Sequence, residues 1–308
     1  MKLTILGCGS ATPTLRHLPS SQILEHKGVL YMIDCGEAVQ ISMRRYKFNF
    51  QKLVHIFISH LHGDHCFGLP GIISSFGLHG RTAPLFIHGP EGIEQFVRPI
   101  LDNFCKGMSY EVKIITHKTD EHSIIFENRN LEVSTLPLQH RIPCAGFLFR
   151  EKGCKPHLRG DLADFYGIPL KMRPQILAGA DYESDQHGVI PNSRLTIPAE
   201  MPETYAYCSD TAFQPSLIPY IKDIDLLYHE TTFMENERQR ATATFHSCTT
   251  DAAKIALKAN VKHLLVGHYS ARYNNDQALA DEAKQIFPQT IAAYEGLQID
   301  IKKLRKRS

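Results

Sequence analysis

The sequence lacks several features that would assign it to particular classes of protein. No apolar run approaches the roughly 20 residues that a membrane-spanning helix needs. The start, MKLTILGCGSATP, is typical of a strand and a glycine turn rather than of a signal peptide. The net charge of the 308 residues is only +2, so charge as a whole does not indicate a nucleic-acid-binding protein. We therefore expect a soluble, cytoplasmic protein that makes no use of a membrane.

The cysteines also lack a pattern. Eight of them are scattered along the chain without a CxxC pair, and no secretory signal accompanies them. We therefore expect reduced thiols rather than disulfides. Histidine, in contrast, is abundant, with 17 residues, and the positions of these histidines indicate where chemistry is to be expected.

Short aliphatic runs alternate with helical patterns along most of the chain, which predicts an α/β fold. Six of these runs lead directly into a histidine or an acidic residue. Because ligand sites in open α/β sheets lie beyond the carboxyl ends of the strands, we expect these side chains to meet. They are Asp34, His60, His140, Asp210, the pair His229 and Glu230, and His268.

The segment FHSCTTDAAKIALKAN, residues 245–260, predicts a helix that precedes the last of these strands. Ser247 or Thr249 is the expected N-cap, and Asp251 in the first turn favours the helix dipole. His246 is then expected just outside the helix N-terminus, on the loop side.

Residues 150 to about 204 differ in composition from the rest of the chain. Six prolines, at positions 156, 169, 174, 191, 198 and 202, interrupt a weak hydrophobic pattern. Between positions 150 and 173, six basic residues stand against three acidic ones. This composition predicts an insertion that projects from the domain rather than a part of its sheet.

The stretch FISHLHGDHCFGLPG, residues 57–71, places His60, His62, Asp64 and His65 within six positions. On an extended or looped backbone, side chains 60 and 62 point the same way and can share one ion, while 64 and 65 face a neighbouring position. Imidazole and carboxylate ligands suit zinc, with manganese and iron as alternatives. A histidine-rich surface loop without metal is disfavoured, because the other predicted strand ends supply further histidine and aspartate ligands. We assign His60, His62 and His140 to a first ion, Asp64, His65 and His268 to a second, and Asp210 as the bridge between them.

The motif SHLHGDH, followed in order by His140, Asp210 and His268, resembles the metallo-β-lactamase superfamily over nearly the whole chain. More narrowly, the chain resembles the tRNase Z family of tRNA 3′-processing endonucleases. The motifs that carry this resemblance are DCGEAVQ at 34–40, HLHGDHCFGLPG at 60–71, SDT at 209–211, HETTF at 229–233, FHS at 245–247 and GHYSARY at 267–273.

The resemblance implies one metallo-β-lactamase domain over residues 1–308, folded as an αββα sandwich with two Zn²⁺ per chain, or Mn²⁺ or Fe²⁺ in their place. It also implies a homodimer that holds precursor tRNA with a projecting arm, for which residues 150–204 are the candidate. Two departures from the family pattern stand out. The segment GIPLKMRPQILAGADY, 167–182, matches the arm motifs only loosely, and the loop PTLRH, 13–17, has His17 where asparagine is expected.

The candidate residues suggest a division of labour in phosphodiester hydrolysis. Two divalent ions roughly 3.5–4 Å apart activate water and clamp the attacking and leaving oxygens. Asp64 can take the proton from that water as general base. Glu230 can orient His246, which donates a proton to the leaving ribose oxygen, a pairing that the resemblance also implies; capping of a strand and of a helix is the alternative. By resemblance, Asp34 is expected to brace the metal loop by hydrogen bonds.

RNA is expected to be held mostly through its phosphates. In the tail KKLRKRS, residues 302–308, an RNA contact and a solvated end are equal alternatives. His55 and most other histidines are expected to be structural, His229 is expected near the site or in the core, and the role of His17 is open. The candidate RNA contacts are Arg150, Lys152, Lys155, Arg159, Lys171 and Arg173 in the insertion and Arg272 near the metals.

Three functions are compatible with a metal site of this kind. A phosphodiesterase, thioesterase or lactamase for small molecules is disfavoured, because a small substrate requires no projecting arm and no Glu230–His246 pair. A metal-bound RNA-binding or scaffold protein without turnover is disfavoured, because no ligand is missing. We predict a zinc-dependent endoribonuclease that cuts precursor tRNA at its 3′ end and leaves a 3′-hydroxyl on the tRNA and a 5′-phosphate on the trailer. Whether the cut lies after the discriminator or after an encoded CCA is open.

Overall fold

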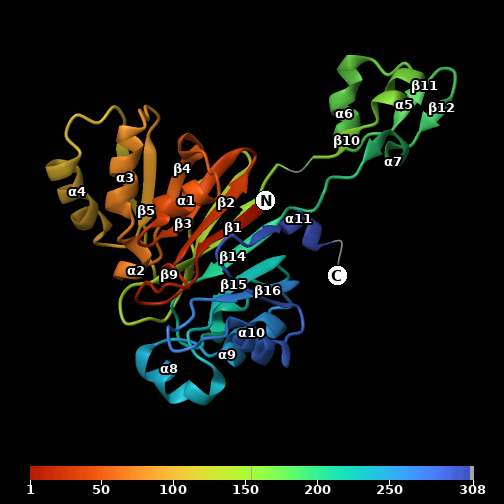
Figure 1. Ribbon diagram of the computed structural model, residues 1–308. Coiled ribbons are helices and arrows are strands. Elements are labelled where there is room, and N and C mark those ends of the chain that lie inside the picture. The colour runs from red at the N-terminus through yellow and green to blue at the C-terminus, as the bar shows by residue number, and fades with distance from the viewer. Residues whose placement is uncertain (154, 306–308) are drawn as a thin grey trace. The chain divides into compact units, whose positions relative to one another are not determined.

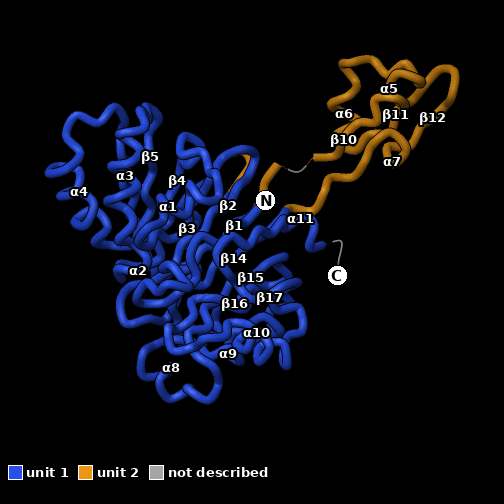
Figure 2. Tube along the Cα trace, viewed as in Figure 1, with its two compact units in different colours: residues 1–128, 132–150, 203–308 blue, residues 129–131, 151–202 orange. Residues whose placement is uncertain are grey.

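The computed structural model describes residues 1–153 and 155–305. The chain divides into two compact units (Figure 2). The first contains residues 1–128, 132–150 and those from 203 onward, and the second contains 129–131 and 151–202. The second unit covers most of the segment in which the sequence predicts an insertion. Residues 306–308 of the basic tail lie outside the described residues.

The first unit contains two seven-stranded sheets. In the first sheet, β3 to β6 are parallel to one another, and the remaining neighbours pair in antiparallel fashion. Its strands lie in the order β18 (Gln298–Asp300), β1 (Lys2–Gly7), β2 (Ser21–His26), β3 (Val29–Cys35), β4 (Leu53–Phe57), β5 (Leu85–Gly89) and β6 (Val112–Thr116).

The second sheet combines a parallel half with an antiparallel half. Strands β14 to β17 are parallel, whereas β14 pairs antiparallel with β9, and β7 pairs antiparallel with β8. The order is β17 (Thr290–Ala292), β16 (His263–Gly267), β15 (Leu226–Glu230), β14 (Thr204–Cys208), β9 (Ala145–Glu151), β8 (Leu131–Pro137) and β7 (Ile124–Glu127).

Helices cover the outer faces of the two sheets (Figure 1). Helices α1 (Val39–Arg45), α3 (Leu69–Leu78) and α4 (Ile93–Phe104) pack on the first sheet, and α9 (Thr249–Lys258) and α10 (Asp276–Lys284) lie against the second. Shorter helices, α2 (Gly63–Cys66), α8 (Arg238–Thr244) and α11 (Ile301–Leu304), lie in connections or near the end. This is the predicted α/β architecture of two sheets between helical layers. No helix among the described residues is long and apolar enough to cross a membrane.

The alternation of side chains along β4 explains why the two sheets stack. Ile56 in β4 and Ile58, the residue directly after the strand, belong to the cluster under the helices of the first sheet. Phe57 points the other way and contacts the rings of Phe147 and Phe149 on β9, with centroids 5.6 and 5.5 Å apart. Because successive side chains of a strand face opposite sides, an unbroken apolar run buries both faces of the sheet. The layers thereby hold the ends of their strands in fixed positions.

Helix α9 begins at Thr249, and its N-cap is Cys248 rather than Ser247 or Thr249. Cys248 forms a capping box with Asp251, whose carboxylate accepts the Cys248 N–H at 3.0 Å. The prediction of the cap was wrong by one residue, because both hydroxyls are used elsewhere. Ser247 donates to the carbonyl of Thr211 at 2.7 Å, and Thr249 donates to Glu282.

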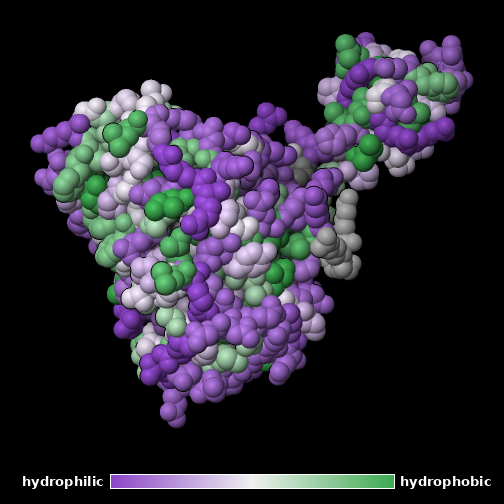
Figure 3. Space-filling view, in the orientation of Figure 1, coloured by the Kyte–Doolittle hydropathy of each residue, from purple (hydrophilic) through white to green (hydrophobic). Residues whose placement is uncertain are grey.

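The second unit has a hydrophobic core of its own, which the weak apolar pattern of residues 150–204 does not predict. Ala163, Ile176 and Leu195 are fully buried in it. Hydrophobic side chains also reach its surface (Figure 3). Phe165 is 68% exposed and Leu170 is 76% exposed. The elements are β10 (His157–Leu158), α5 (Gly160–Phe165), α6 (Arg173–Leu177), β11 (Tyr182–Ser184), β12 (Gly188–Ile190), α7 (Asn192–Leu195) and β13 (Thr196–Ile197).

Candidate metal centre

The side chains at the strand ends converge at one place in the first unit. The loop after β4 and the short helix α2 carry the HxHxDH motif, and α2 ends at Cys66. Two of the convergent residues, Asp34 and His268, have positive φ angles of 54° and 62°. Residues other than glycine rarely adopt this left-handed conformation, and where they do they often mark functional sites.

Four side chains form a first donor cluster. His60 Nε2 lies 3.0 Å from His62 Nδ1, which lies 3.3 Å from His140 Nε2. Asp210 Oδ2 lies 3.5 Å from His60 Nε2 and 3.7 Å from His140 Nε2. The four donor atoms all lie within 4.8 Å of one another, close enough to share one ion.

Asp64, His65 and His268 form a second cluster. Asp64 Oδ2 lies 3.4 Å from His65 Nε2 and 3.5 Å from His268 Nε2. Asp210 reaches this cluster with its other oxygen, because Oδ1 lies 3.5 Å from His65 Nε2 and 3.2 Å from His268 Nε2. Asp210 thus turns one carboxylate oxygen towards each cluster, which is the arrangement of a bridging ligand.

Three atoms of this arrangement have no hydrogen-bond partner although they are buried: His65 Nε2, His268 Nε2 and Asp210 Oδ1. A buried polar atom without a partner costs about 1–3 kcal/mol, so folded proteins seldom leave three of them together. Cations would satisfy all three. The donor set of imidazoles and carboxylates therefore fits two divalent ions of the zinc, manganese or iron type.

Asp34 lies behind the clusters and binds the loop that carries the HxHxDH motif. Its carboxylate accepts hydrogen bonds from the Ser59 backbone N–H at 2.7 Å, the Ser59 hydroxyl at 2.8 Å and the Tyr207 hydroxyl at 2.6 Å. It also accepts one from His65 Nδ1 at 2.7 Å. Because Nδ1 is occupied in this way, the lone pair of His65 Nε2 is directed at the second cluster.

Glu230 and His246 form a hydrogen-bonded pair beside the clusters, with His246 Nδ1 2.9 Å from Glu230 Oε1. Glu230 is fully buried and also accepts backbone N–H groups from Thr211, Thr232 and Ser247. Burial alone would lower the pKa of His246, but the charge and hydrogen bond of Glu230 raise it to about 9. Burial likewise opposes the charge on Glu230, yet His246 lowers the pKa of this carboxyl. Glu230 thus holds His246 Nδ1 in place and favours the protonated form of the ring.

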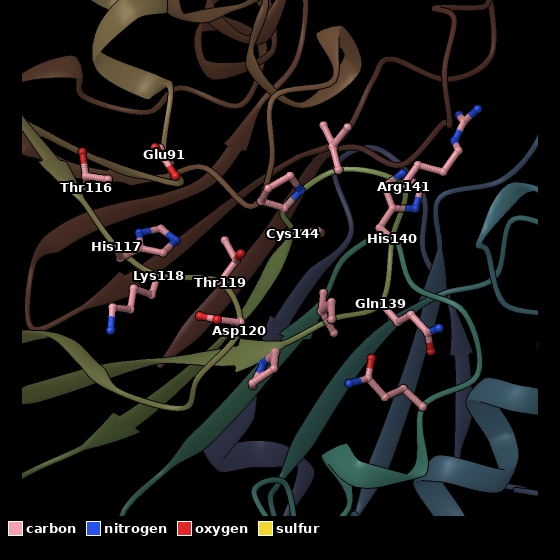
Figure 4. Close-up of a pocket in the computed structure, with 15 residues that line it drawn as sticks. Glu91, Thr116, His117, Lys118, Thr119, Asp120, Gln139, His140, Arg141 and Cys144 are labelled. Atoms are coloured by element: carbon pink, nitrogen blue, oxygen red, sulfur yellow. The ribbon is translucent and has the colours of Figure 1, made fainter.

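Two adjoining cavities give access to these side chains. One, of about 600 Å³, is lined by His62, Asp64, Asp210, His246 and His268. The other, of about 1090 Å³, has the segment 116–120 along one wall and His140 with Arg141 along the other (Figure 4). Arg141 lines both cavities, and it was not among the residues selected from the sequence.

The sequence also did not identify the loop at residues 10–13, which lines the smaller cavity. The backbone N–H of Ala11 donates to Asp64 Oδ2 at 2.7 Å. Almost every residue type has a backbone N–H, so the sequence does not indicate that Ala11 donates to Asp64. Arg141, in contrast, could have been found as the basic neighbour of His140.

Three other residues considered from the sequence belong to neither donor cluster: His229, His55 and Arg272. His229 is fully buried in β15, and its Nδ1 bonds to the Glu230 carbonyl. His55 lies in the core beside His88, 3.0 Å away between ring nitrogens, and burial lowers the pKa of His55 to about 4. Arg272 pairs with Glu237 at 3.4 Å.

The basic residues selected in the insertion divide between the units. Arg150 is exposed at the edge of the first unit, and Arg173 pairs with Asp164 at 3.1 Å. Arg173 and the rest of the set belong to the second unit; the others are Lys152, Lys155, Arg159 and Lys171.

Known proteins resemble this chain over nearly its full length. A protein of Parabacteroides distasonis named Ribonuclease Z is 54% identical over 97% of this chain and 98% of its own length. One of Porphyromonas gingivalis with the same name is 54% identical over 96% and 98%. The family model described as Anti-Pycsar protein Apyc1 matches residues 1–152.

Solved structures agree in fold. Human tRNase Z, short form, aligns with a TM-score of 0.71 at 22% identity over 98% of this chain and 99% of that one. The metallo-β-lactamase fold protein YhfI from Bacillus subtilis aligns with a TM-score of 0.69 at 21% identity over 97% and 99%. The predicted metallo-β-lactamase sandwich is thereby confirmed. From its fold and from the identity to its full-length relatives, the chain belongs to the ribonuclease Z family.

Proposed function

We propose that this enzyme is the endoribonuclease that removes the 3′ trailer from precursor tRNA, leaving a 3′-hydroxyl on the tRNA and a 5′-phosphate on the trailer. The observation that carries the proposal is the combination, in one cavity, of two donor clusters bridged by Asp210 with the Glu230–His246 pair. The 54% identity to proteins named Ribonuclease Z supports it. In this proposal the enzyme acts as a homodimer in the cytoplasm.

In the proposed centre, His60, His62 and His140 would hold one zinc ion and Asp64, His65 and His268 would hold the other. Asp210 would contribute one carboxylate oxygen to each. Manganese or iron suits the same donors. Bound there, the two ions supply a water of lowered pKa and positive charge for the phosphate of the substrate.

Asp64 is the proposed general base. Its Oδ2 is engaged by the Ala11 N–H and faces His65 and His268. Its other oxygen, Oδ1, then takes the proton of the attacking water. The hydrogen bond from Ala11 orients the carboxylate before it accepts the proton.

His246 is the proposed general acid for the leaving 3′-oxygen of the ribose. Glu230 holds its Nδ1 at 2.9 Å, so Nε2 is the ring nitrogen that faces substrate. The proton leaves Nε2 as the bond from phosphorus to oxygen breaks, and the anionic Glu230 stabilises the imidazolium before transfer.

The function is tested with purified, zinc-loaded protein and a precursor tRNA that carries a short 3′ trailer. We expect one cut at the acceptor end, with a hydroxyl on the tRNA and a phosphate on the trailer. No cleavage of the RNA by protein that holds two ions, together with rapid hydrolysis of a small phosphodiester, would instead favour a phosphodiesterase for small molecules. Mapping of the cut also determines its position relative to the discriminator and an encoded CCA.

The second unit is proposed to hold the tRNA through its phosphates. Replacing Lys155, Arg159 and Lys171 with alanine is expected to raise KM for precursor tRNA several-fold and to leave hydrolysis of a small phosphodiester unchanged. Each lost phosphate contact should also reduce the slope of log KM against log salt by about 0.7–0.9. Steady-state kinetics at several salt concentrations measure both effects.

A matched control for the second unit removes three exposed lysines of the first unit, which lowers the net charge by the same amount. If KM for the RNA rises equally in both triple variants, general electrostatic attraction is responsible and the proposed role of the second unit is wrong. The control residues are Lys47, Lys106 and Lys258.

A further inference from the structure

A third cluster of potential ligands lies in the first unit and shares no residue with the candidate centre. It consists of Cys8, just after β1, His17 in the loop between β1 and β2, and Glu295, in the turn after β17. Cys8 is fully buried and His17 is 7% exposed. We propose that the Cys8 sulfur, His17 Nδ1 and Glu295 Oε1 bind a divalent cation of the zinc type, in a structural site separate from the two ions of catalysis.

The distances between the three donor atoms fit a single ion. Cys8 Sγ lies 3.5 Å from His17 Nδ1 and 3.7 Å from Glu295 Oε1, and His17 Nδ1 lies 3.2 Å from Glu295 Oε1. Usual zinc–sulfur, zinc–nitrogen and zinc–oxygen bond lengths in a tetrahedron give donor separations of about 3.3–3.6 Å. The three measured distances lie at or near this range, and a fourth position is left for water.

Hydrogen bonds from neighbouring groups orient His17 and Glu295, as they commonly orient the ligands of metal sites. His17 Nε2 donates to Asp276 Oδ2 at 2.8 Å, so the ring nitrogen opposite the proposed ion is bound by a carboxylate. This is the usual partner of a metal-binding histidine, because it fixes the tautomer and makes the imidazole a better donor. The Leu18 N–H donates to Glu295 Oε1 at 3.1 Å and fixes the second donor.

Charge balance permits two states of this cluster, and they differ by two protons. Without an ion, Cys8 is a thiol, because burial and then Glu295 raise its pKa well above the ordinary value. The hydrogen bond to Glu295 and the charges of Glu295 and Asp276 raise the pKa of His17 against the effect of burial, and so favour its protonated form. A bound divalent cation displaces the proton of the thiol and the proton on Nδ1, so the net charge is unchanged. In the protonated state, the proton is held by His17 and the two carboxylates, and the Cys8 sulfur takes no part. In the cation-bound state, the Cys8 sulfur, His17 and Glu295 are all ligands.

The cluster lies at the two ends of the loop formed by residues 8–17, which contains Ala11. The Tyr269 N–H donates to the Cys8 carbonyl at 2.9 Å, and the Ser10 N–H donates to the Tyr269 carbonyl at 3.0 Å. One residue further along, Ala11 donates to Asp64. An ion that ties Cys8 to His17 and Glu295 therefore fixes both ends of the loop that positions the proposed base.

The test counts metals and asks whether sulfur is among the ligands. Protein loaded with zinc and passed through a desalting column is expected to contain three ions per chain, and the Cys8→Ser variant two. Protein loaded with cobalt is expected to show a thiolate-to-cobalt charge-transfer band in the near ultraviolet. That band should disappear in Cys8→Ser and persist in Cys105→Ser, which removes a buried cysteine remote from both sites.

A second variant, His17→Asn, guards against misfolding of the first, and it too should hold two ions. Two ions per chain in the parent protein with no sulfur band would overturn the proposal in favour of the protonated cluster. Three ions without a sulfur band would also overturn it, because the third ion would then lie elsewhere. Neither readout depends on RNA cleavage, so the proposed function stands or falls separately.

Discussion

Replacing Asp64 with asparagine is expected to slow cleavage of precursor tRNA by about 10³- to 10⁴-fold while two ions per chain stay bound in the catalytic centre. The amide keeps an oxygen for Ala11 and for a metal, but it cannot accept a proton. Replacing Asp64 with alanine removes both functions and should abolish cleavage and weaken the ion held with His65 and His268. Single-turnover kinetics and metal analysis on the same preparations distinguish the two losses.

Asp102→Asn is the control, because Asp102 is exposed on α4 and lies outside both cavities. An Asp64→Asn protein that carries its ions and cleaves within about tenfold of the parent rate would exclude Asp64 as the base. The proton of the water would then have to go to another group, and Asp64 would be a ligand only.

Replacing His246 with alanine is expected to have the second largest effect, and the effect should depend on the leaving group. Cleavage of precursor tRNA, whose ribose oxygen leaves poorly without a proton, should slow by about 10²- to 10⁴-fold. Hydrolysis of bis(p-nitrophenyl) phosphate should change little, because nitrophenolate leaves as a stable anion. The two rates are measured on the same preparation, by RNA sizing and by absorbance.

Glu230→Gln is the companion to this experiment, since it keeps a hydrogen-bond acceptor beside His246 Nδ1 but removes the charge. Its cleavage rate should lie between those of the parent and His246→Ala. An equal loss on both substrates in His246→Ala would mean that the ring supports the neighbouring rings of His140 and His268, 5.1 and 5.6 Å away, rather than donating a proton.

A phosphodiesterase for small molecules would behave differently in these experiments. It would use the 600 Å³ cavity alone and would lose nothing when the basic residues of the second unit are removed. The larger cavity, bordered by Arg141, would then have no role in turnover. Kinetics of the triple lysine and arginine variant on RNA therefore discriminate between the two functions as well as testing the arm.

Much of the site could be predicted from the sequence because strand ends are local signals. An apolar run that stops at a histidine or an acid predicts both the strand and the direction in which the next side chain is presented. His60, His62 and Asp64 are close in sequence, so their proximity needs little tertiary information. His140, Asp210 and His268 come after three other strands of one sheet. Strands β14 and β16, which precede Asp210 and His268, belong to the parallel half of that sheet, so their carboxyl ends lie at a common edge. His140 follows β8, in the antiparallel half of the same sheet.

The second unit and the cap of α9 show where local sequence patterns are insufficient. The second unit has a core in which Ala163, Ile176 and Leu195 are fully buried. The six prolines and the weak apolar pattern do not predict this core, because it is built from short, irregular elements. The N-cap falls on Cys248 because the hydroxyls of Ser247 and Thr249 already have partners from other segments. Such competition between partners is decided by packing, which no window of sequence contains.

By itself, the sequence determined the α/β class, the donor types available to the candidate metal centre, and the family, since these depend on residue identity and on spacing along one chain. Only the tertiary structure decided that Asp210 turns one oxygen to each donor cluster and that Ala11 binds Asp64 through its backbone. It alone brought Cys8 and His17 to Glu295, a residue 287 positions after Cys8. Contacts at that separation depend on how whole sheets stack, and no pattern along a short stretch of sequence contains that information.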